Sequence, residues 1–216
     1  MVTNVFNFVK TVFFNFRYLP FKQAIHLPIQ VTLNLRNIQL KRGQIVLKKY
    51  WRKCVRIDCG GSLGLQEFSG GIYMSPNSKL IFHGSAKLGK GTVLRCDENA
   101  IIEIGEGFFC NKNCFFRCND KIVFGDRCIV GWNVQINTTN GHRIWTEDKE
   151  SKDSGPVFIG NHVWITSNVI ITKNVTVSED SVVAQGAVLT SIFKKKHVLI
   201  GGVPAKIIKE NIYWAS

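Results

Sequence analysis

The sequence predicts a parallel β-helix, because a six-residue repeat runs through it and one long polar segment interrupts that repeat. From residue 159 to residue 189 an aliphatic residue recurs at every sixth position, and Val, Ser or Ala follows four residues after each of the first five. An α-helix repeats every 3.6 residues and a strand every 2, so neither element alone gives this period. A chain coiled around a triangular core does, with three hexads per coil and coils stacked about 4.7 Å apart. The six positions are Ile159, Ile165, Ile171, Val177, Val183 and Leu189.

The same pattern extends upstream with changes of phase, which indicate turns that carry extra residues. The main coil is therefore predicted over residues 88–193, and residues 31–87, whose alternation is weaker, are predicted to form irregular first coils. The upstream series are Leu88, Leu94 and Ala100; Ile104, Cys110, Phe116 and Ile122; and Phe124, Val130 and Ile136.

The repeat stops at His142 and resumes at Ile159. The segment 142–158 between them is mostly polar and contains four acidic residues. A long excursion from a regular solenoid is a common position for functional residues. We therefore expect the functional site near residues 142–158.

Charge divides the chain into two segments. Residues 1–56 hold eleven Lys or Arg and no acidic residue, whereas residues 57–216 hold seventeen Lys or Arg against fifteen Asp or Glu. We assign 1–56 to a basic, aromatic-rich lead-in and cap, helical or irregular over residues 1–30, and 57–216 to the β-helix domain. Pro204 and the following run 205–213 predict a short C-terminal helix or strap.

The lead-in has three possible roles. Seven aromatic residues interleave with Lys10, Arg17 and Lys22, which fits a helix that lies on a membrane surface. They could equally form a cap that closes the open end of the coil, since solenoids need caps. Contact with nucleic acid is the least favoured, and we expect none. No secretory signal or spanning segment is evident, so a cytoplasmic protein with seven free thiols is expected.

The resumed coil carries the resemblance to a known family. The run Ile159-Gly160-Asn161-His162-Val163-Trp164-Ile165, the later Gly186-Ala187-Val188 and the terminal Gly202-Val203-Pro204-Ala205-Lys206 resemble the hexapeptide-repeat acyltransferases, in the branch of sugar and surface-polysaccharide O-acetyltransferases. The resemblance covers residues 80–210. It implies a left-handed parallel β-helix, a homotrimer, and acetyl-coenzyme A bound between coils of two subunits as the donor for a sugar or glycan acceptor.

The resemblance assigns catalysis to His142. In such enzymes a histidine at the start of the excursion is the general base, and it removes the proton from an acceptor hydroxyl as the oxygen attacks the thioester directly. Histidine suits this role because its ordinary pKa lies near neutral pH. The segment before it, 137–141, lacks the Asp that orients the base in some relatives, and Glu147 and Asp148 are the acids nearest in sequence.

Further site residues follow from the same resemblance. Asn111 matches the family's substrate-binding asparagine, and Trp132 and Trp164 are candidates to line the acceptor and thioester ends of the groove. Ser167 and Gln185 fall beside the pantetheine arm. Lys206 and Lys209 fall near the phosphates of coenzyme A, which is polyanionic. The chain departs from the usual pattern at Thr166, Gln185, Ser191 and Val203.

Other readings of the sequence remain open. The same base could serve an N-acetyltransferase that acts on an amino sugar, or the chain could be a non-catalytic β-helix that docks through its basic segment. Cys110, Cys114 and Cys118 lack the paired spacing of zinc sites. We therefore expect no metal requirement.

Overall fold

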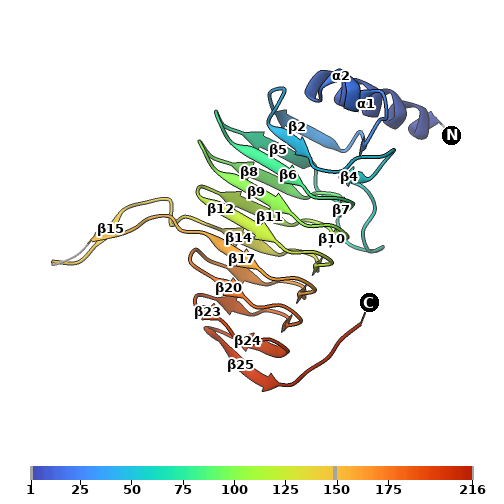
Figure 1. Cartoon of the computed structure of the whole chain (residues 1–216). Helices are drawn as coiled ribbons and strands as arrows, with labels where there is room; N and C mark the ends of the chain where they lie inside the picture. The colour runs from blue at the N-terminus through green and yellow to red at the C-terminus, as the bar shows by residue number, and fades with distance from the viewer. Residues whose placement is uncertain (1, 148–149, 216) are drawn as a thin grey trace.

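The computed structural model describes residues 2–147 and 150–215 and shows a three-sided coil of parallel strands, closed at its N-terminal end by two helices (Figure 1). Strands of sheets A, B and C follow one another around each coil. Sheet A contains β1 (Ile29–Val31), β4 (Val55–Ile57), β7 (Ala86–Leu88), β10 (Phe108–Cys110), β13 (Ile129–Val130), β18 (Trp164–Ile165), β21 (Val182–Val183), β24 (Val198–Gly202) and β25 (Ala205–Glu210).

The other two sheets have seven strands each. Sheet B contains β2 (Leu35–Gln39), β5 (Gly70–Met74), β8 (Val93–Cys96), β11 (Phe115–Cys118), β14 (Gln135–Asn137), β19 (Ile170–Ile171) and β22 (Val188–Leu189). Sheet C contains β3 (Ile45–Leu47), β6 (Lys79–Phe82), β9 (Ile101–Ile104), β12 (Lys121–Phe124), β17 (Val157–Ile159), β20 (Thr176–Val177) and β23 (Ile192–Phe193). We call the turns from sheet A to sheet B the A–B edge, and the turns from B to C the B–C edge.

The predicted repeat is confirmed residue by residue. Every predicted hexad position from Leu88 to Leu189 is buried, and so are the residues four positions after the hexads of the resumed coil. Ile165 pairs with Val183 in register, three hexads further along the chain. Strands before the excursion have up to four or five residues, such as β9, whereas each strand from β18 to β23 has two. The changes of phase lie at the four-residue strands β9 and β12 of sheet C, so the extra residues are in strands and not in turns.

Large aromatic side chains fill the wide coils. The Phe124 ring lies 4.8 Å from that of Phe108 and 5.4 Å from that of Phe116, and all three are fully buried. Between residues 159 and 189 the hexad positions and the positions four residues later hold only the smaller Val, Ile, Leu, Ala and Ser. The side-chain volume at the inward positions thus matches the width of each coil.

The lead-in forms α1 (Val2–Tyr18) and α2 (Phe21–Ala24), which lie across the N-terminal end of the coil (Figure 1). Strands β1, β2 and β3 already stack on the next coil, so the segment 1–56 contains both helices and a complete first turn of the coil. None of the helices within the described ranges is long and apolar enough to span a membrane.

Two segments leave the regular coil. The excursion forms a hairpin of β15 (Ile144–Trp145) and β16 (Glu150–Ser151) that projects away from the B–C edge (Figure 1). Beyond Pro204 the chain forms the antiparallel strand β25 rather than a helix, because its backbone pairs with β24, and residues 211–215 then run along the coil as a strap. Of the two forms predicted for the C-terminus, the strap is the one observed.

All seven cysteines are buried free thiols, which should make them unreactive in the native protein. Burial raises the pKa of both Cys59 and Cys128 to about 11, so their thiolate forms are scarce at pH 8. We expect iodoacetamide at pH 8 to alkylate these thiols only after denaturation, as counted by mass spectrometry. Rapid native alkylation of several thiols would contradict the buried arrangement.

Candidate active site

Four of the predicted site residues lie along the A–B edge in consecutive coils. Asn111 follows β10, Trp132 follows β13, Ser167 follows β18 and Gln185 follows β21. The strands that precede them are neighbours in sheet A, so their turns stack on one another. The structure therefore brings the acceptor candidates Asn111 and Trp132 and the pantetheine candidates Ser167 and Gln185 onto one edge.

Trp132 and Ser167 are in direct contact along this edge. The Trp132 backbone N–H donates to Ser167 Oγ at 3.3 Å, and the Asn168 N–H donates to the Trp132 carbonyl at 3.0 Å. A Cβ at Gly131 would lie 2.6 Å from Ser167 Oγ, so only glycine permits these two turns to approach so closely. Gln185, one coil further, is exposed.

Asn111 uses its amide to hold a neighbouring loop. Its Nδ2 donates to Ser62 Oγ at 2.8 Å, and its Oδ1 accepts from the N–H groups of Ser62 at 3.0 Å and Lys112 at 2.9 Å. The side chain is buried beneath loop 60–69. In the conformation observed, the amide of Asn111 is thus committed to the protein, and acceptor binding by it requires movement of this loop.

A second asparagine nearby, Asn113, was not among the candidates predicted from the sequence. Asn113 lines a cleft of about 580 Å³ on the outer face of sheet B, together with Phe115, Asn133, Gln135 and Asn168. Asn113 Oδ1 is buried without a hydrogen-bond partner among the described residues. Amides beside an aromatic ring can bind sugar hydroxyls. Asn113, Asn133 and Asn168 recur at one turn position with φ of 59°, 55° and 59°, a pattern that sequence alone indicates only as a turn residue.

His142 stands apart, at the B–C edge where β14 has ended. Its side chain is exposed at the base of the excursion hairpin. Just before it, Thr138 and Thr139 are buried, and the carbonyl of Thr138 accepts from the Gly155 N–H at 2.9 Å. The excursion is therefore fixed where it leaves and rejoins the coil, and this holds the backbone beside His142.

No polar partner of the His142 ring is found within the described residues. Glu147, one of the two acids considered for orienting the ring, is exposed, and Asp148 lies outside the described residues. The guanidinium of Arg117 also lies beside this segment, since its Nη1 would lie 3.6 Å from a Cβ at Gly141. Arg117 Nε lies 3.8 Å from Asp97 Oδ2 across the same edge.

A single chain does not bring His142 to the A–B edge. The two edges are separated by the width of sheet B, whose strand β11 has four residues, or roughly 13 Å at 3.3 Å per residue. His142 and Ser167 thus lie at opposite ends of one face. A site that contains both needs the A–B edge of a second copy.

The remaining candidates lie near the C-terminus. Lys206 and Lys209 are on β25, where they pair with Gly201 and Leu199, and both are exposed. Trp164 is on the outer face of sheet A, 5.9 Å from Trp214 of the C-terminal strap, and Trp214 stacks on His162 at 4.1 Å. The strap therefore covers part of the Trp164 surface. No group of three metal-binding side chains occurs in residues 2–147 and 150–215.

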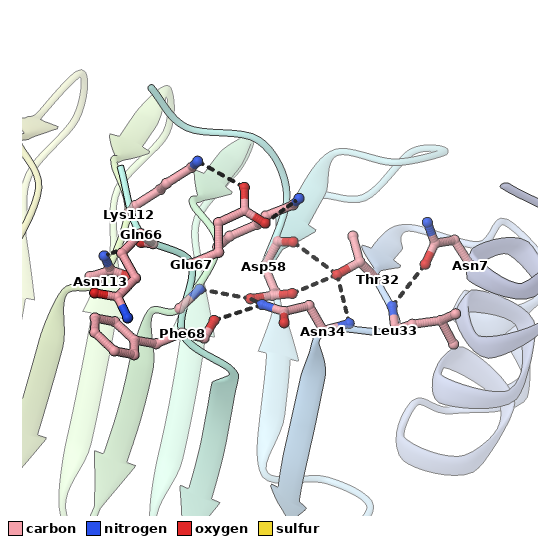
Figure 2. Close-up of polar contacts among 12 residues, drawn as sticks. Asn7, Thr32, Leu33, Asn34, Asp58, Gln66, Glu67, Phe68, Lys112 and Asn113 are labelled. Carbon is pink, nitrogen blue, oxygen red and sulfur yellow. Dashed lines mark hydrogen bonds and ion pairs between the residues drawn. The ribbon is translucent and has the colours of Figure 1, made fainter. Parts of the chain in front are cut away.

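A polar network fixes loop 60–69 beside the cleft (Figure 2). Lys112 and Lys90 each form an ion pair with Glu67 at 2.8 Å, which holds the pKa of Glu67 below its usual range, and Asn113 donates to the Gln66 carbonyl at 2.8 Å. Only 4% of the Lys112 side chain is exposed. The loop therefore contributes Phe68 and Ser69 to the cleft as an ordered wall.

Asp58 is the buried centre of this network. Its Oδ2 accepts from Thr32 Oγ1 at 2.5 Å, and its Oδ1 accepts from the Gly91 N–H at 2.9 Å and from Asn34 Nδ2 at 3.2 Å. Burial raises the pKa of Asp58, and these hydrogen bonds oppose that rise. Asn34 also donates to the Phe68 carbonyl at 2.8 Å. Asp58 thereby ties the first coil to loop 60–69.

Known acetyltransferases are similar to this chain in sequence. Sophorolipid acetyltransferase of Starmerella bombicola is 49% identical over 110 residues, 50% of this chain and 42% of that protein. Galactoside O-acetyltransferase of Escherichia coli strain K12 is 33% identical over 111 residues, 50% of this chain and 54% of that protein. The chain thus spans about half the length of the curated relatives it matches. No family model matches it.

A solved structure is similar to this one over most of the coil. The polysialic acid-specific acetyltransferase NeuO superposes with a TM-score of 0.50 at 20% identity, and the match covers 88% of this chain and 83% of that chain. At this identity the likeness establishes the fold, a left-handed parallel β-helix. The chain is thus similar in fold to this acetyltransferase, and half of it is similar in sequence to two further acetyltransferases.

Proposed function

We propose that the chain is an acetyl-coenzyme A-dependent O-acetyltransferase that acts on a sugar hydroxyl in surface-polysaccharide biosynthesis. The observation that carries this proposal is the interruption of the coil at His142, which presents an exposed imidazole at the B–C edge. Two relatives of the chain are named as acetyltransferases, and one of them acts on galactosides by its name. The proposal extends that chemistry to this chain.

The imidazole of His142 acts as the general base. A hydroxyl is too weakly acidic to lose its proton unaided at neutral pH, so the ring accepts that proton as the oxygen attacks the thioester carbonyl. The carbon–oxygen bond of the ester forms, the carbon–sulfur bond breaks, and coenzyme A leaves with the proton on its sulfur. The excursion is anchored at Thr138 and Gly155, which keeps the ring near the coil.

The A–B edge of a neighbouring subunit supplies the donor side. Ser167 and Gln185 flank the pantetheine arm there, Trp132 and Trp164 line the two ends of the groove, and Lys206 with Lys209 binds the phosphates. Asn113, with its unpaired Oδ1, and Asn111, once loop 60–69 moves, are the amides that hold the acceptor. This arrangement needs a second copy of the chain, because one chain keeps the two edges apart, and the assembly that we propose is a homotrimer.

The proposed donor places the reaction in the cytoplasm, where seven free thiols also persist. Contact of residues 1–56 with the inner membrane surface is a separate proposal, because it depends on α1 and not on His142.

The activity is tested with the purified chain, acetyl-coenzyme A and a panel of neutral, acidic and amino sugars. We expect acceptor-dependent release of coenzyme A thiol and a product that gains one acetyl group by mass spectrometry. An O-acetyl ester is cleaved by alkaline hydroxylamine, whereas an N-acetyl amide is stable. A hydroxylamine-resistant product would identify an N-acetyltransferase, and no thiol release with any acceptor would favour a non-catalytic β-helix.

A further inference from the structure

Helix α1 buries two polar residues on its inner face, beside the apolar Phe14 and Tyr18. Thr11 and Asn15 are buried against β1, the first strand of sheet A. Thr11 Oγ1 exchanges hydrogen bonds of 3.1 Å with the N–H and carbonyl of Val31. Asn15 accepts from the Ile29 N–H at 3.1 Å and donates to its carbonyl at 2.6 Å. These side chains replace the missing preceding coil, so the inner face of α1 is the predicted cap.

The outer face of α1 is also largely apolar, whereas the outer face of a surface helix is usually polar. Six large apolar side chains on it are between 39% and 62% exposed, although the cap does not need them. Phe21 and Ile25 of the α2 region extend the surface, and the Phe21 ring lies 6.0 Å from that of Phe16. We call this surface the α1 outer face: Val5, Phe6, Phe8, Val9, Phe13, Phe16, Phe21 and Ile25.

Cations surround this apolar surface without acidic neighbours in sequence. The first acidic residue of the chain is Asp58, which is buried in the network beneath β1 and β2. The Arg17 guanidinium lies 5.8 Å from the Phe13 ring, and Arg42 donates to the carbonyls of Phe16 and Arg17 at 2.5 and 3.3 Å. Lys22 is exposed on α2. An apolar centre with a cationic rim complements an anionic lipid surface.

We propose that the α1 outer face binds an anionic phospholipid bilayer, with α1 lying in the headgroup region. The aromatic and aliphatic side chains enter the acyl boundary, and Arg17, Lys22 and Arg42 contact lipid phosphates. A second copy of the chain is a poorer occupant, because it would place two sets of these cations against each other. The proposal rests on α1 alone and stands whether or not the chain transfers acetyl groups.

The test is flotation of the full-length chain with vesicles of phosphatidylcholine, with and without 30% phosphatidylglycerol. We expect binding to the anionic vesicles that weakens at high salt. Substituting Phe6 and Phe13 together by Ser should lower binding at least tenfold, since both side chains leave the bilayer. The matched control is Leu63→Ser, a residue 96% exposed on loop 60–69, which should bind as the unmodified chain does.

The contribution of the cationic side chains to vesicle binding is tested separately. Arg17→Gln and Lys22→Gln should each lower affinity for anionic vesicles about fivefold, at roughly 1 kcal/mol per charge near the surface. Lys194→Gln, exposed near the opposite end of the coil, is the control. Circular dichroism should show that all these surface variants remain folded.

Two results would overturn the proposal. One is that the chain binds neutral and anionic vesicles equally, and that this binding is unchanged in the Phe6→Ser, Phe13→Ser variant and in Arg17→Gln. The other is a fall in the native mass of the Phe6→Ser, Phe13→Ser variant in sedimentation experiments without loss of vesicle binding, which would assign the surface to contact between copies of the chain.

Discussion

Replacing His142 by Ala is expected to lower turnover by about 10²- to 10⁴-fold, the usual contribution of a positioned general base. The imidazole is exposed, and no polar contact of its ring is found within the described residues, so its removal should leave the coil intact. The loss of activity should therefore appear in kcat, with little change in KM for acetyl-coenzyme A. Steady-state thiol release measures both constants.

A matched control separates catalysis from the loss of any histidine. His83 follows strand β6, and 43% of its side chain is exposed. Its Nε2 lies 3.3 Å from Glu103 Oε2. His83→Ala should retain nearly full activity, and both variants should keep the melting temperature of the unmodified chain. Unchanged turnover of the folded His142→Ala variant would refute the assignment of the base.

Asp58→Ala should lower the free energy of unfolding by about 2–4 kcal/mol, the largest stability effect expected of a polar substitution here. It removes one acceptor from each of Thr32 Oγ1, Asn34 Nδ2 and the Gly91 N–H, and the Gly91 N–H is left buried. Asp58 also has φ of 61°, a conformation that disfavours Ala by about 1 kcal/mol. Urea unfolding followed by circular dichroism gives the value.

Asp58→Asn is the matched control for that experiment. Asn tolerates the left-handed conformation and keeps an acceptor for Gly91 and Asn34, so it should cost much less than Ala. A loss under 0.5 kcal/mol for Asp58→Ala, on the scale usual for surface substitutions, would contradict the role of the network.

The Asp58→Asn variant should also differ from the unmodified chain in how its free energy of unfolding depends on pH. The pKa of Asp58 is raised in the folded chain, so the folded state binds more protons than the unfolded state above pH 3.8. Its contribution to stability therefore decreases as pH rises from 3.8 through the folded pKa and is constant beyond it. Asp58→Asn should lack this component of the pH dependence of stability.

The hexads made the coil predictable from sequence, because each inward position recurs at a fixed interval. Ile165 and Val183 occupy the same place in successive coils, as the period requires. The wide coils were harder to predict, because longer strands change the phase of the repeat between Ala100 and Ile104 and between Ile122 and Phe124. A simple period cannot give the number of residues in a strand.

The spatial relation of the site residues could not be read from the sequence. His142 and Asn111 lie about thirty residues apart along the chain, but turns of different length place them at opposite edges of sheet B. Loop 60–69 contacts Asn111 and Lys112 from a distant part of the chain, through Ser62 and Glu67. Such contacts have no local signal in composition or spacing.

The lead-in was only partly predictable for a similar reason. Its helices, basic charge and aromatic residues are properties of the sequence alone. Which side of α1 faces the coil is decided by Thr11 and Asn15, which bond to the open edge of β1. A cap and a membrane surface are therefore compatible, on opposite faces of one helix.

The most direct test of the shared site is complementation between two variants of the chain. His142→Ala removes the base at the B–C edge, and Gln185→Trp fills the groove at the exposed A–B turn, so each alone should be inactive. When the two are co-expressed with different tags and purified as mixed trimers, about one of the three sites in each trimer should combine two intact edges, so about a third of the activity should be recovered. Mixed trimers that stay inactive would show that both edges act within one chain and would contradict the account.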